Sequence, residues 1–427
     1  MKSIDSTDQR PNKLTELRRS ILLITEQEYP SDHSFLEEVY SKLLPDKGYK
    51  IVWLMRARAG EHFKGVRRES WNNSTVYVLP PLYRHTLADQ LKRKLWFLQL
   101  LYWMFIIIKR ESIGVLQSRD LCEYALAGSM AKLFRSVKFI HQESFDQEGY
   151  ALFWLEKGLS SIRGNYLQSL LRKIKLIAKI KLKPMLLRKA DLVFPASVNL
   201  YEKFVREGIQ EQKMMVVPLG FNFKSLVTLS EQEKLMIRKG LGLAETIVLG
   251  FWGVIVRERK LGILIDVIAE LRKQNKNVRL LIIGEDTDHS LRQYAVQCNV
   301  DDRIVFLGKM SREEVYHYGQ ILDIGLSPYT PTLADNSRSP VKIIEMMSLG
   351  VPVIATDIDE QRILIHESGG GICVQYDATA IAGAVSRLID NPHEREKMGA
   401  NGRRYAEDNR SYLEIGRRVY DKTSSLF

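Results

Sequence analysis

The sequence predicts an α/β protein with two domains, each built around a parallel β-sheet. The chain has 427 residues, which is long enough for two hydrophobic cores. Short apolar runs alternate with longer amphipathic segments, the pattern of parallel strands connected by helices. The alternation restarts after a turn at Pro218–Gly220. We therefore expect an N-terminal domain over residues 1–222, a C-terminal domain over 223–408, and a segment 409–427 whose helix packs back on the first domain.

Apolar runs bounded by polar residues mark the strands of the first half. We expect these strands at Ile21–Thr25, Tyr49–Leu54, Thr75–Leu79, Ile113–Leu116, Val137–Ile140 and Ala190–Ser197. The helices between them are expected at about Ser34–Leu44, Leu121–Leu133 and Asn199–Glu207. Residues 1–18 are polar and charged, so we expect a disordered or loosely packed start.

The second half repeats this alternation of strands and helices. We expect its strands at Thr246–Trp252, Val278–Gly284, Ile304–Gly308, Ile324–Ser327 and Val351–Ala355. The helices are expected at Leu261–Gln274, Ala378–Leu388, Glu394–Ala406 and Tyr412–Ser424, with one more directly before the last strand.

The chain is basic, with 63 Lys and Arg against 51 Asp and Glu and a net charge of +12. Such a surplus suits nucleic acid, an anionic membrane or a phosphorylated substrate. The three cysteines, Cys122, Cys298 and Cys373, are far apart and lack metal-ligand spacing, which favours a reducing compartment. We find no apolar leader and no apolar run of about 20 residues, and therefore expect a cytoplasmic protein.

The apolar run at Leu95–Ile108 is too short to cross a membrane. Basic residues flank it at 92–94 and 109–110. One interpretation is a helix buried against the sheet. The other is a helix that also enters a membrane interface through Trp96 and Trp103.

Residues 169–190 hold eight Lys or Arg and no acidic residue. At helical spacing, four of these cations share one side: Arg172, Lys175, Lys179 and Lys183. The helix should break at Pro184. A basic amphipathic helix is typical of membrane-surface binding, and the alternative is a solvated basic face over an ordinary core contact. Nucleic acid is not expected as a partner, because the run lacks interleaved aromatic residues and no nucleic-acid motif is present.

An anion site is predicted where a helix begins before the last strand. Ser339 is a suitable N-cap, Pro340 a suitable first helical residue, and Gly350 a suitable stop. The helix start would present free N–H groups, with Lys342 in its first turn. Glu345 lies one turn further and can accept hydrogen bonds from hydroxyl groups beside the anion. A phosphate with a neighbouring diol describes a nucleoside diphosphate.

Two other strand ends carry residues suited to a ligand. Gly253 opens a turn after a predicted strand, and three cations follow it: Arg257, Arg259 and Lys260. A glycine turn with cations can grip a phosphate. His141 directly follows another predicted strand, and the carboxyl ends of parallel strands face the ligand crevice. A lone histidine is more often structural than functional, so the position alone leaves both roles open.

Five segments of the second half form a characteristic series: Phe251–Val254, Leu280–Glu285, Phe306–Gly308, Ile324–Pro328 and Ser339–Ala355. In their order and spacing they resemble the retaining nucleotide-sugar glycosyltransferases of family 4, which have the GT-B fold. Residues 188–222 also resemble the inter-domain region of the family, and the resemblance covers about 113–422. It implies two Rossmann-like domains that face each other across a cleft, with the nucleotide sugar held mainly by the second.

The resemblance also implies roles for individual residues. The pyrophosphate would meet Gly253, Arg257, Arg259, Lys260, Ser339, Pro340, Val341 and Lys342. Glu345 would hold the ribose hydroxyls, and the loops that contain Glu285 and Gly308 would border the base. His141 would lie near the transferred sugar, so the expected catalytic residues are His141, Lys342 and Glu345.

The chain departs from the family pattern at several positions. Family members commonly carry two glutamates eight positions apart, but the first is replaced here by Ser337, with Asp335 out of register. The glycine-rich loop after the first strand is absent from residues 26–33, and Val254 stands where a basic residue is common. Two acidic pairs could hold a metal ion, Asp286 with Asp288 and Asp357 with Asp359. We nevertheless expect no metal and no cofactor, because the cations can hold the pyrophosphate.

These observations predict transfer of a sugar from a nucleoside-diphosphate sugar to a glycan or polyprenyl-lipid-linked acceptor, with retention, in cell-surface polysaccharide or lipopolysaccharide biosynthesis. An anionic membrane would be met through residues 92–110 and 169–190, so the protein would be peripheral on the inner face of the plasma membrane. Two alternatives stay open: a nucleotide-sugar epimerase of the same architecture, and a non-catalytic transferase-like binding protein.

Overall fold

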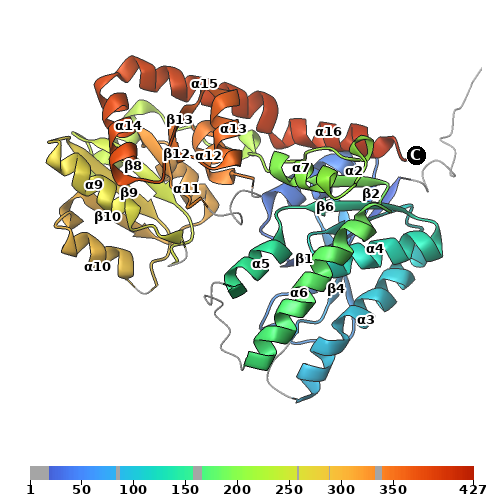
Figure 1. The fold of residues 1–427 in the computed structure, drawn as a ribbon. Coiled ribbons are helices and arrows are strands. Elements are labelled where there is room, and N and C mark those ends of the chain that lie inside the picture. Colours follow the sequence, from blue (N-terminus) through green and yellow to red (C-terminus); the bar gives the residue numbers. More distant parts are fainter. Residues whose placement is uncertain (1–18, 83–86, 157–165, 257–258, 288, 332–338) are drawn as a thin grey trace, which may run out of the picture. The chain divides into compact units, whose positions relative to one another are not determined.

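The computed structural model describes residues 19–82, 87–156, 166–256, 259–287, 289–331 and 339–427, with only the backbone of 87–94 and 166–168. Contacts divide the chain into two compact units (Figure 1). Unit 1 comprises the residues up to Ala196, Leu200–Val217 and Gly416–Phe427, and unit 2 comprises Ser197–Asn199 and Pro218–Ile415. Each unit has its own predominantly parallel sheet, which confirms the predicted α/β class.

Unit 1 contains a seven-stranded sheet in the order β3-β4-β2-β1-β5-β6-β7. Its strands are β1 (Ser20–Tyr29), β2 (Lys50–Ala57), β3 (Arg67–Trp71), β4 (Ser74–Leu79), β5 (Val115–Arg119), β6 (Lys138–Glu143) and β7 (Leu192–Pro195). The neighbours pair in parallel, except that β3 forms an antiparallel hairpin with β4. The sequence did not predict β3, because this edge strand is polar and carries no apolar run.

The helices of unit 1 pack on this sheet. They are the π-helix η1 (Leu36–Leu43), α2 (Leu44–Asp46), α3 (Leu87–Arg110), α4 (Cys122–Arg135), α5 (Gln147–Glu156), α6 (Tyr166–Leu187), α7 (Val198–Arg206) and the 3-10 turn η2 (Glu211–Lys213). One apolar cluster joins the sheet to α3, α4, α7 and the end of α6. The predicted helix break at Pro184 is wrong. The helix continues to Leu187 because Leu186 and Leu187 are buried in this cluster.

Unit 2 contains a six-stranded parallel sheet in the order β10-β9-β8-β11-β12-β13. Its strands are β8 (Ile247–Trp252), β9 (Val278–Ile283), β10 (Ile304–Gly308), β11 (Ile324–Ser327), β12 (Val353–Thr356) and β13 (Gly371–Val374). Successive side chains of a strand point to opposite faces. In β9, Leu280 and Ile282 therefore join one apolar cluster, while Leu281 and Ile283 join another.

Helices cover both faces of this second sheet (Figure 1). One cluster contains residues of α9 (Ile263–Lys273), α10 (Ser290–Gln297) and α14 (Ala378–Asp390). The other contains residues of α11 (Arg312–Gly319), α12 (Val341–Ser348), α13 (Asp359–Ser368) and α15 (Pro392–Arg410). The remaining helical elements are α8 (Glu231–Gly240), α16 (Tyr412–Ser424) and the 3-10 turns η3 (Phe223–Ser225) and η5 (Asp301–Arg303).

The last helix, α16, ends in unit 1. The Tyr49 hydroxyl lies 3.0 Å from Ser424 Oγ, and the rings of Tyr49 and Tyr420 are 5.8 Å apart. Within unit 2, the Phe221 N–H donates to the Arg410 carbonyl over 2.8 Å. The C-terminal residues thus pack on the unit that holds the N-terminal sheet.

Candidate functional site

In the sheet of unit 2, the direction in which successive strands are added reverses between β8 and β11. From β8 the strand order leads through β9 to β10, and from β11 it leads in the opposite direction through β12 to β13. In open parallel sheets, ligands bind outside the carboxyl ends of the strands at such a reversal. Gly253 follows β8 and Tyr329 lies shortly after β11, so these two residues flank the expected position of a ligand.

Gly253 allows two predicted cations to meet at the end of β8. Its φ of +136° is a conformation that favours glycine. A Cβ at this position would overlap the end of the Lys342 side chain and would lie 3.5 Å from Arg259 Nη1. Lys342 Nζ also donates to the Tyr329 hydroxyl over 3.2 Å. Neither cation forms an ion pair with an acidic residue in the part of the chain that the structure describes, so their charge is available to an anion.

Glu345 is held from two sides by aromatic residues. Trp252 Nε1 donates to one carboxylate oxygen over 2.9 Å, and the Tyr316 hydroxyl donates to the other over 2.9 Å. The three residues come from the end of β8, from α11 and from α12. Burial raises the pKa of Tyr316, as does the neighbouring Glu345 carboxylate, so the phenol remains a donor at physiological pH. The carboxylate of Glu345 is therefore fixed in direction while its residue stays half-buried.

The start of α12 differs from the prediction. The helix begins at Val341 and Pro340 is its N-cap, so the predicted N-cap role of Ser339 is wrong. Ser339 Oγ instead accepts a hydrogen bond from the Leu219 N–H over 3.2 Å, and the Val341 N–H donates to the Ser339 carbonyl over 2.9 Å. The first helical N–H group is therefore already used. The predicted contacts of Ser339, Pro340 and Val341 with a nucleotide sugar stay predictions.

The ends of β8, β9 and β10 lie side by side. The Gly284 N–H donates to the Gly308 carbonyl over 2.8 Å, and a Cβ at Gly284 would overlap the Gly253 carbonyl. Glu285 is exposed beside these glycines. Contacts of Glu285 and Gly308 with a base stay predictions. Four residues named in the sequence analysis lie outside the described residues: Arg257, Asp288, Asp335 and Ser337.

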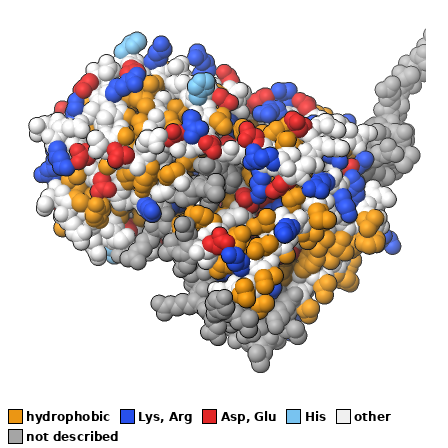
Figure 2. All heavy atoms as spheres, in the orientation of Figure 1, with side chains coloured by type: hydrophobic (Ala, Val, Ile, Leu, Met, Phe, Trp, Pro, Cys, Tyr) orange, Lys and Arg blue, Asp and Glu red, His pale blue; other side chains and the backbone are white. Residues whose placement is uncertain are grey.

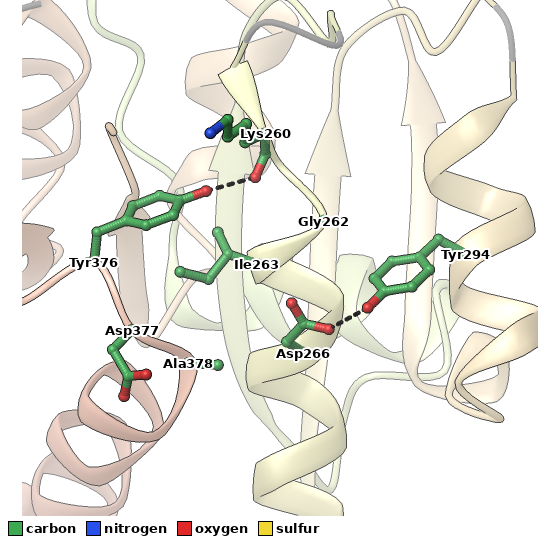
Figure 3. A pocket seen from close by; sticks show the side chains of 8 residues that line it. All are labelled: Lys260, Gly262, Ile263, Asp266, Tyr294, Tyr376, Asp377 and Ala378. Atoms are coloured by element: carbon green, nitrogen blue, oxygen red, sulfur yellow. Dashed lines mark hydrogen bonds between the residues drawn. The ribbon is translucent and has the colours of Figure 1, made fainter. Parts of the chain in front are cut away.

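Lys260 borders a different hollow of unit 2 (Figure 3). This cavity of about 490 Å³ is lined by Lys260, Gly262, Ile263, Asp266, Tyr294, Tyr376, Asp377 and Ala378. The Tyr376 hydroxyl donates to the Lys260 carbonyl over 2.7 Å, and the Tyr294 hydroxyl donates to Asp266 over 2.6 Å. Its lining does not include the residues that meet at Gly253. Arg259 and Lys342 thus meet at Gly253, while Lys260 lines this other hollow, and its contact with a sugar donor stays a prediction.

His141 is placed in unit 1, inside β6 rather than after the strand as predicted, because pairing with β5 continues beyond it. It is fully buried, with Nδ1 2.8 Å from Ser118 Oγ and Nε2 2.8 Å from Glu143 Oε2. Burial, and next Lys183, lower the pKa of His141 to about 3, so the ring is neutral at physiological pH. These are the contacts of a structural histidine, and its catalytic role stays a prediction.

Three aromatic neighbours of the site were missed from the sequence: Trp252, Tyr316 and Tyr329. Trp252 and Tyr329 stand at or just after the ends of predicted strands, and that position was an available signal. Tyr316 lies in α11, a short helix that the sequence analysis did not predict. Thr356 was also missed. Its hydroxyl accepts from the Tyr329 N–H over 2.8 Å and so fixes the loop after β11.

Known proteins match the part of the chain that contains this site. Residues 233–405 match the family described as glycosyl transferases group 1. Alpha-D-kanosaminyltransferase of Streptomyces kanamyceticus is 25% identical over 40% of this chain and 44% of its own length. Capsular polysaccharide biosynthesis glycosyltransferase CapM of Staphylococcus aureus is 24% identical over 51% of this chain and 57% of its own length. The match thus spans about half the length of these relatives.

Solved structures match the whole fold. Sucrose-phosphate synthase of Thermosynechococcus elongatus superposes with a TM-score of 0.73 at 18% identity, over 96% of this chain and 99% of that chain. HepE of Anabaena, solved in complex with UDP-glucose, superposes with a TM-score of 0.68 at 15% identity, over 95% and 99% of the two chains. At these identities the likeness shows the fold alone. The chain therefore has the GT-B fold, and its residues 233–405 are similar to the glycosyl transferases group 1 family.

Proposed function

We propose that this protein is a glycosyltransferase that moves a sugar from a nucleoside-diphosphate sugar to a hydroxyl group of a glycan or lipid-linked acceptor, with retention of configuration. The observation that carries the proposal is the convergence of Arg259 and Lys342 on Gly253, next to the fixed carboxylate of Glu345. The matched transferases support it, as does the UDP-glucose complex of HepE. The capsular polysaccharide enzyme supports a role in cell-surface polysaccharide biosynthesis.

The site supplies the electrostatics that this reaction needs. The bond between C1 of the sugar and the diphosphate oxygen breaks, a bond forms between C1 and the acceptor oxygen, and the hydroxyl proton of the acceptor passes to the departing diphosphate. Negative charge then grows on the departing diphosphate. Fixed cations that face this charge stabilise the transition state more than the ground state. Arg259 and Lys342 would provide them, so the proposal requires neither a metal ion nor a cofactor.

Nucleotide binding provides the first test of the proposal. We expect one of UDP, GDP, ADP and CMP, or a sugar conjugate, to raise the melting temperature, because a ligand at a hundred times its Kd adds about 2.7 kcal/mol of stability. Glu345→Ala should remove most of this shift, since Glu345 would hold the ribose. A thermal scan measures both. If no nucleotide shifts the native protein, the non-catalytic alternative gains support.

Product analysis separates transfer from epimerisation. With the donor alone, an epimerase converts one sugar nucleotide into another, whereas a transferase leaves the donor unchanged or slowly hydrolyses it. With an acceptor present, a transferase releases nucleoside diphosphate and forms a glycoside. Conversion of the sugar nucleotide without acceptor would contradict the proposed function.

We further propose that unit 1 binds an anionic membrane that carries the acceptor. On α3, Leu98 is 60% and Tyr102 63% exposed, and at the end of α4, Leu133 is 74% and Phe134 64% exposed. The exposed apolar residues of α6 are Leu170, Leu171, Ile174, Leu182 and Met185. Figure 2 shows apolar side chains gathered on the face of unit 1 where α3 and α6 lie, with cations among them. Amphipathic helices of this composition favour a membrane surface.

The structure corrects which residues would meet the membrane. Trp96 and Trp103 are half-buried and pack against the core, and the entry of these two side chains into a membrane interface stays a prediction. Lys183 is buried rather than part of the basic face. Within the part of the chain that the structure describes, the helices are either too short or too polar to span a bilayer.

Vesicle binding tests this surface. We expect the double variant Leu98→Glu, Tyr102→Glu to bind vesicles of anionic lipid at least about tenfold more weakly at low salt, because it removes apolar contact and adds repulsive charge. Leu413→Glu is the matched control, since Leu413 is also 60% exposed but lies on α16. Co-sedimentation measures both. Native protein that ignores the vesicles at low salt would contradict the membrane proposal.

A further inference from the structure

We infer that Trp252 and Tyr316 are positioning residues that make the site select a ribonucleotide donor over its 2′-deoxy counterpart. The inference rests on the proposed function, in which Glu345 holds the ribose of the donor. It concerns how the carboxylate is held rather than whether a nucleotide binds. The two aromatic residues would not touch the donor and would act through Glu345.

The two hydrogen bonds from Trp252 and Tyr316 leave the Glu345 carboxylate with acceptor positions for a ligand. An ionised carboxylate offers about two acceptor positions on each oxygen. Trp252 occupies one position on Oε2 and Tyr316 one on Oε1. Each oxygen therefore keeps about one further position. Two vicinal hydroxyl groups can fill these positions with one hydrogen bond to each oxygen, and the 2′- and 3′-hydroxyls of ribose form such a pair. A 2′-deoxyribose would leave one carboxylate oxygen short of a donor.

The supports of the carboxylate are rigid. Trp252 is 5% exposed, and a Cβ on Gly319 would lie 3.5 Å from its ring, so the indole packs closely against α11. The ring of Tyr316 lies 4.8 Å from that of Phe221. Because packing fixes both donors, the carboxylate cannot turn freely to follow a ligand that lacks one hydroxyl. A site built around a hydroxyl group rejects the analogue without it more strongly than an adaptable site does.

The experiment compares ribonucleotides with deoxyribonucleotides. Calorimetry gives the Kd of UDP, GDP, ADP and CDP and of their 2′-deoxy forms. For the nucleotide that binds, we expect the native protein to prefer the ribo form by about tenfold to a hundredfold, the value of one hydrogen bond to a charged group. Tyr316→Phe and Trp252→Phe should each reduce this ratio severalfold, because the freed carboxylate oxygen can then reorient. The matched control is Tyr318→Phe on the same helix, which should keep the native ratio.

The ratio of the Kd values for the deoxy and ribo forms would not change if Trp252 and Tyr316 had a purely structural role. A variant that only loosens the fold would lower the stability of the protein and weaken the binding of both nucleotides by the same factor. Tyr316→Phe removes a single hydroxyl, so it serves as the test even where Trp252→Phe fails to fold. Equal affinity for ribo and deoxy forms in the native protein overturns the inference. So does a ratio that stays unchanged in a folded Tyr316→Phe variant, although both results leave the proposed function standing. If none of the nucleotides binds, the proposed function fails and the inference fails with it.

Discussion

Replacing Lys342 by alanine is expected to lower kcat by about two to three orders of magnitude. The end of the Lys342 side chain packs against Gly253 at the end of β8, next to Arg259. In the proposed reaction the ammonium group of Lys342 faces the diphosphate. The charge of the leaving group grows as the bond to C1 breaks, so a fixed ammonium group stabilises the transition state more than the bound donor. Steady-state turnover of donor and acceptor measures the effect. The KM for the donor should change less than kcat.

A lysine far from the site provides the matched control. Lys239 is exposed near the end of α8, and Lys239→Ala should leave kcat within about twofold of the native value, as surface substitutions usually do. Equal losses in the two variants would contradict the site. Retained nucleotide binding in Lys342→Ala, measured by the thermal shift, would show that the variant is folded and that the loss concerns the reaction.

The position of this site could be predicted because it depends on local sequence signals. Apolar runs define where strands end, and the ends of parallel strands mark the ligand edge. Strand β11, over Ile324–Ser327, has the bounds that its apolar run predicted. Gly253 was identified in the same way, as the first residue after a strand. Lys342 and Glu345 were identified by their spacing from the expected start of a helix.

The supports of the site could not be predicted, because they depend on packing between distant segments. Trp252 and Glu345 are separated by 93 residues, and their hydrogen bond exists because the end of β8 and α12 join the same apolar cluster. Tyr316 reaches the same carboxylate from a third element. No periodicity within one segment contains this information. For the same reason the local pattern predicted an N-cap role for Ser339, whereas in the folded chain its hydroxyl accepts a hydrogen bond from the Leu219 N–H.

The basic face predicted for α6 is a second case in which contacts with distant segments could not be predicted from the local sequence. Helical spacing put Lys183 among the exposed cations, and the structure buries it to 6% exposure. Its Nζ donates to Glu143 over 2.7 Å, to Glu148 over 2.5 Å and to the Asp120 carbonyl over 2.7 Å. These partners lie far from Lys183 in sequence, so an isolated helical wheel cannot reveal them. The position carries a buried charge network rather than a membrane contact.

Replacing Lys183 by methionine is therefore expected to destabilise the protein by about 3–5 kcal/mol. Methionine retains an apolar stem but leaves the carboxyl groups of Glu143 and Glu148 buried without their cation. The pKa of Glu143 is already well above its usual range because of burial, and Lys183 counteracts that rise. Without the lysine this pKa should rise further above the value in the unfolded chain. Stability would then be greatest at low pH and would be lost as pH rises toward the folded-state pKa.

Thermal unfolding at pH 5 and pH 8 tests this expectation with a control from the same helix. Lys175→Met removes an exposed lysine of α6 and should change stability by no more than about 0.5 kcal/mol at either pH. Lys183→Met should lose more at pH 8 than at pH 5, because ionised carboxylates are costlier to bury than neutral carboxyls. Adding Glu148→Gln should recover part of the loss, since it removes one of the two uncompensated acids. If Lys183→Met were as stable as Lys175→Met, the buried network around Lys183 would add no net stability, which would contradict this expectation.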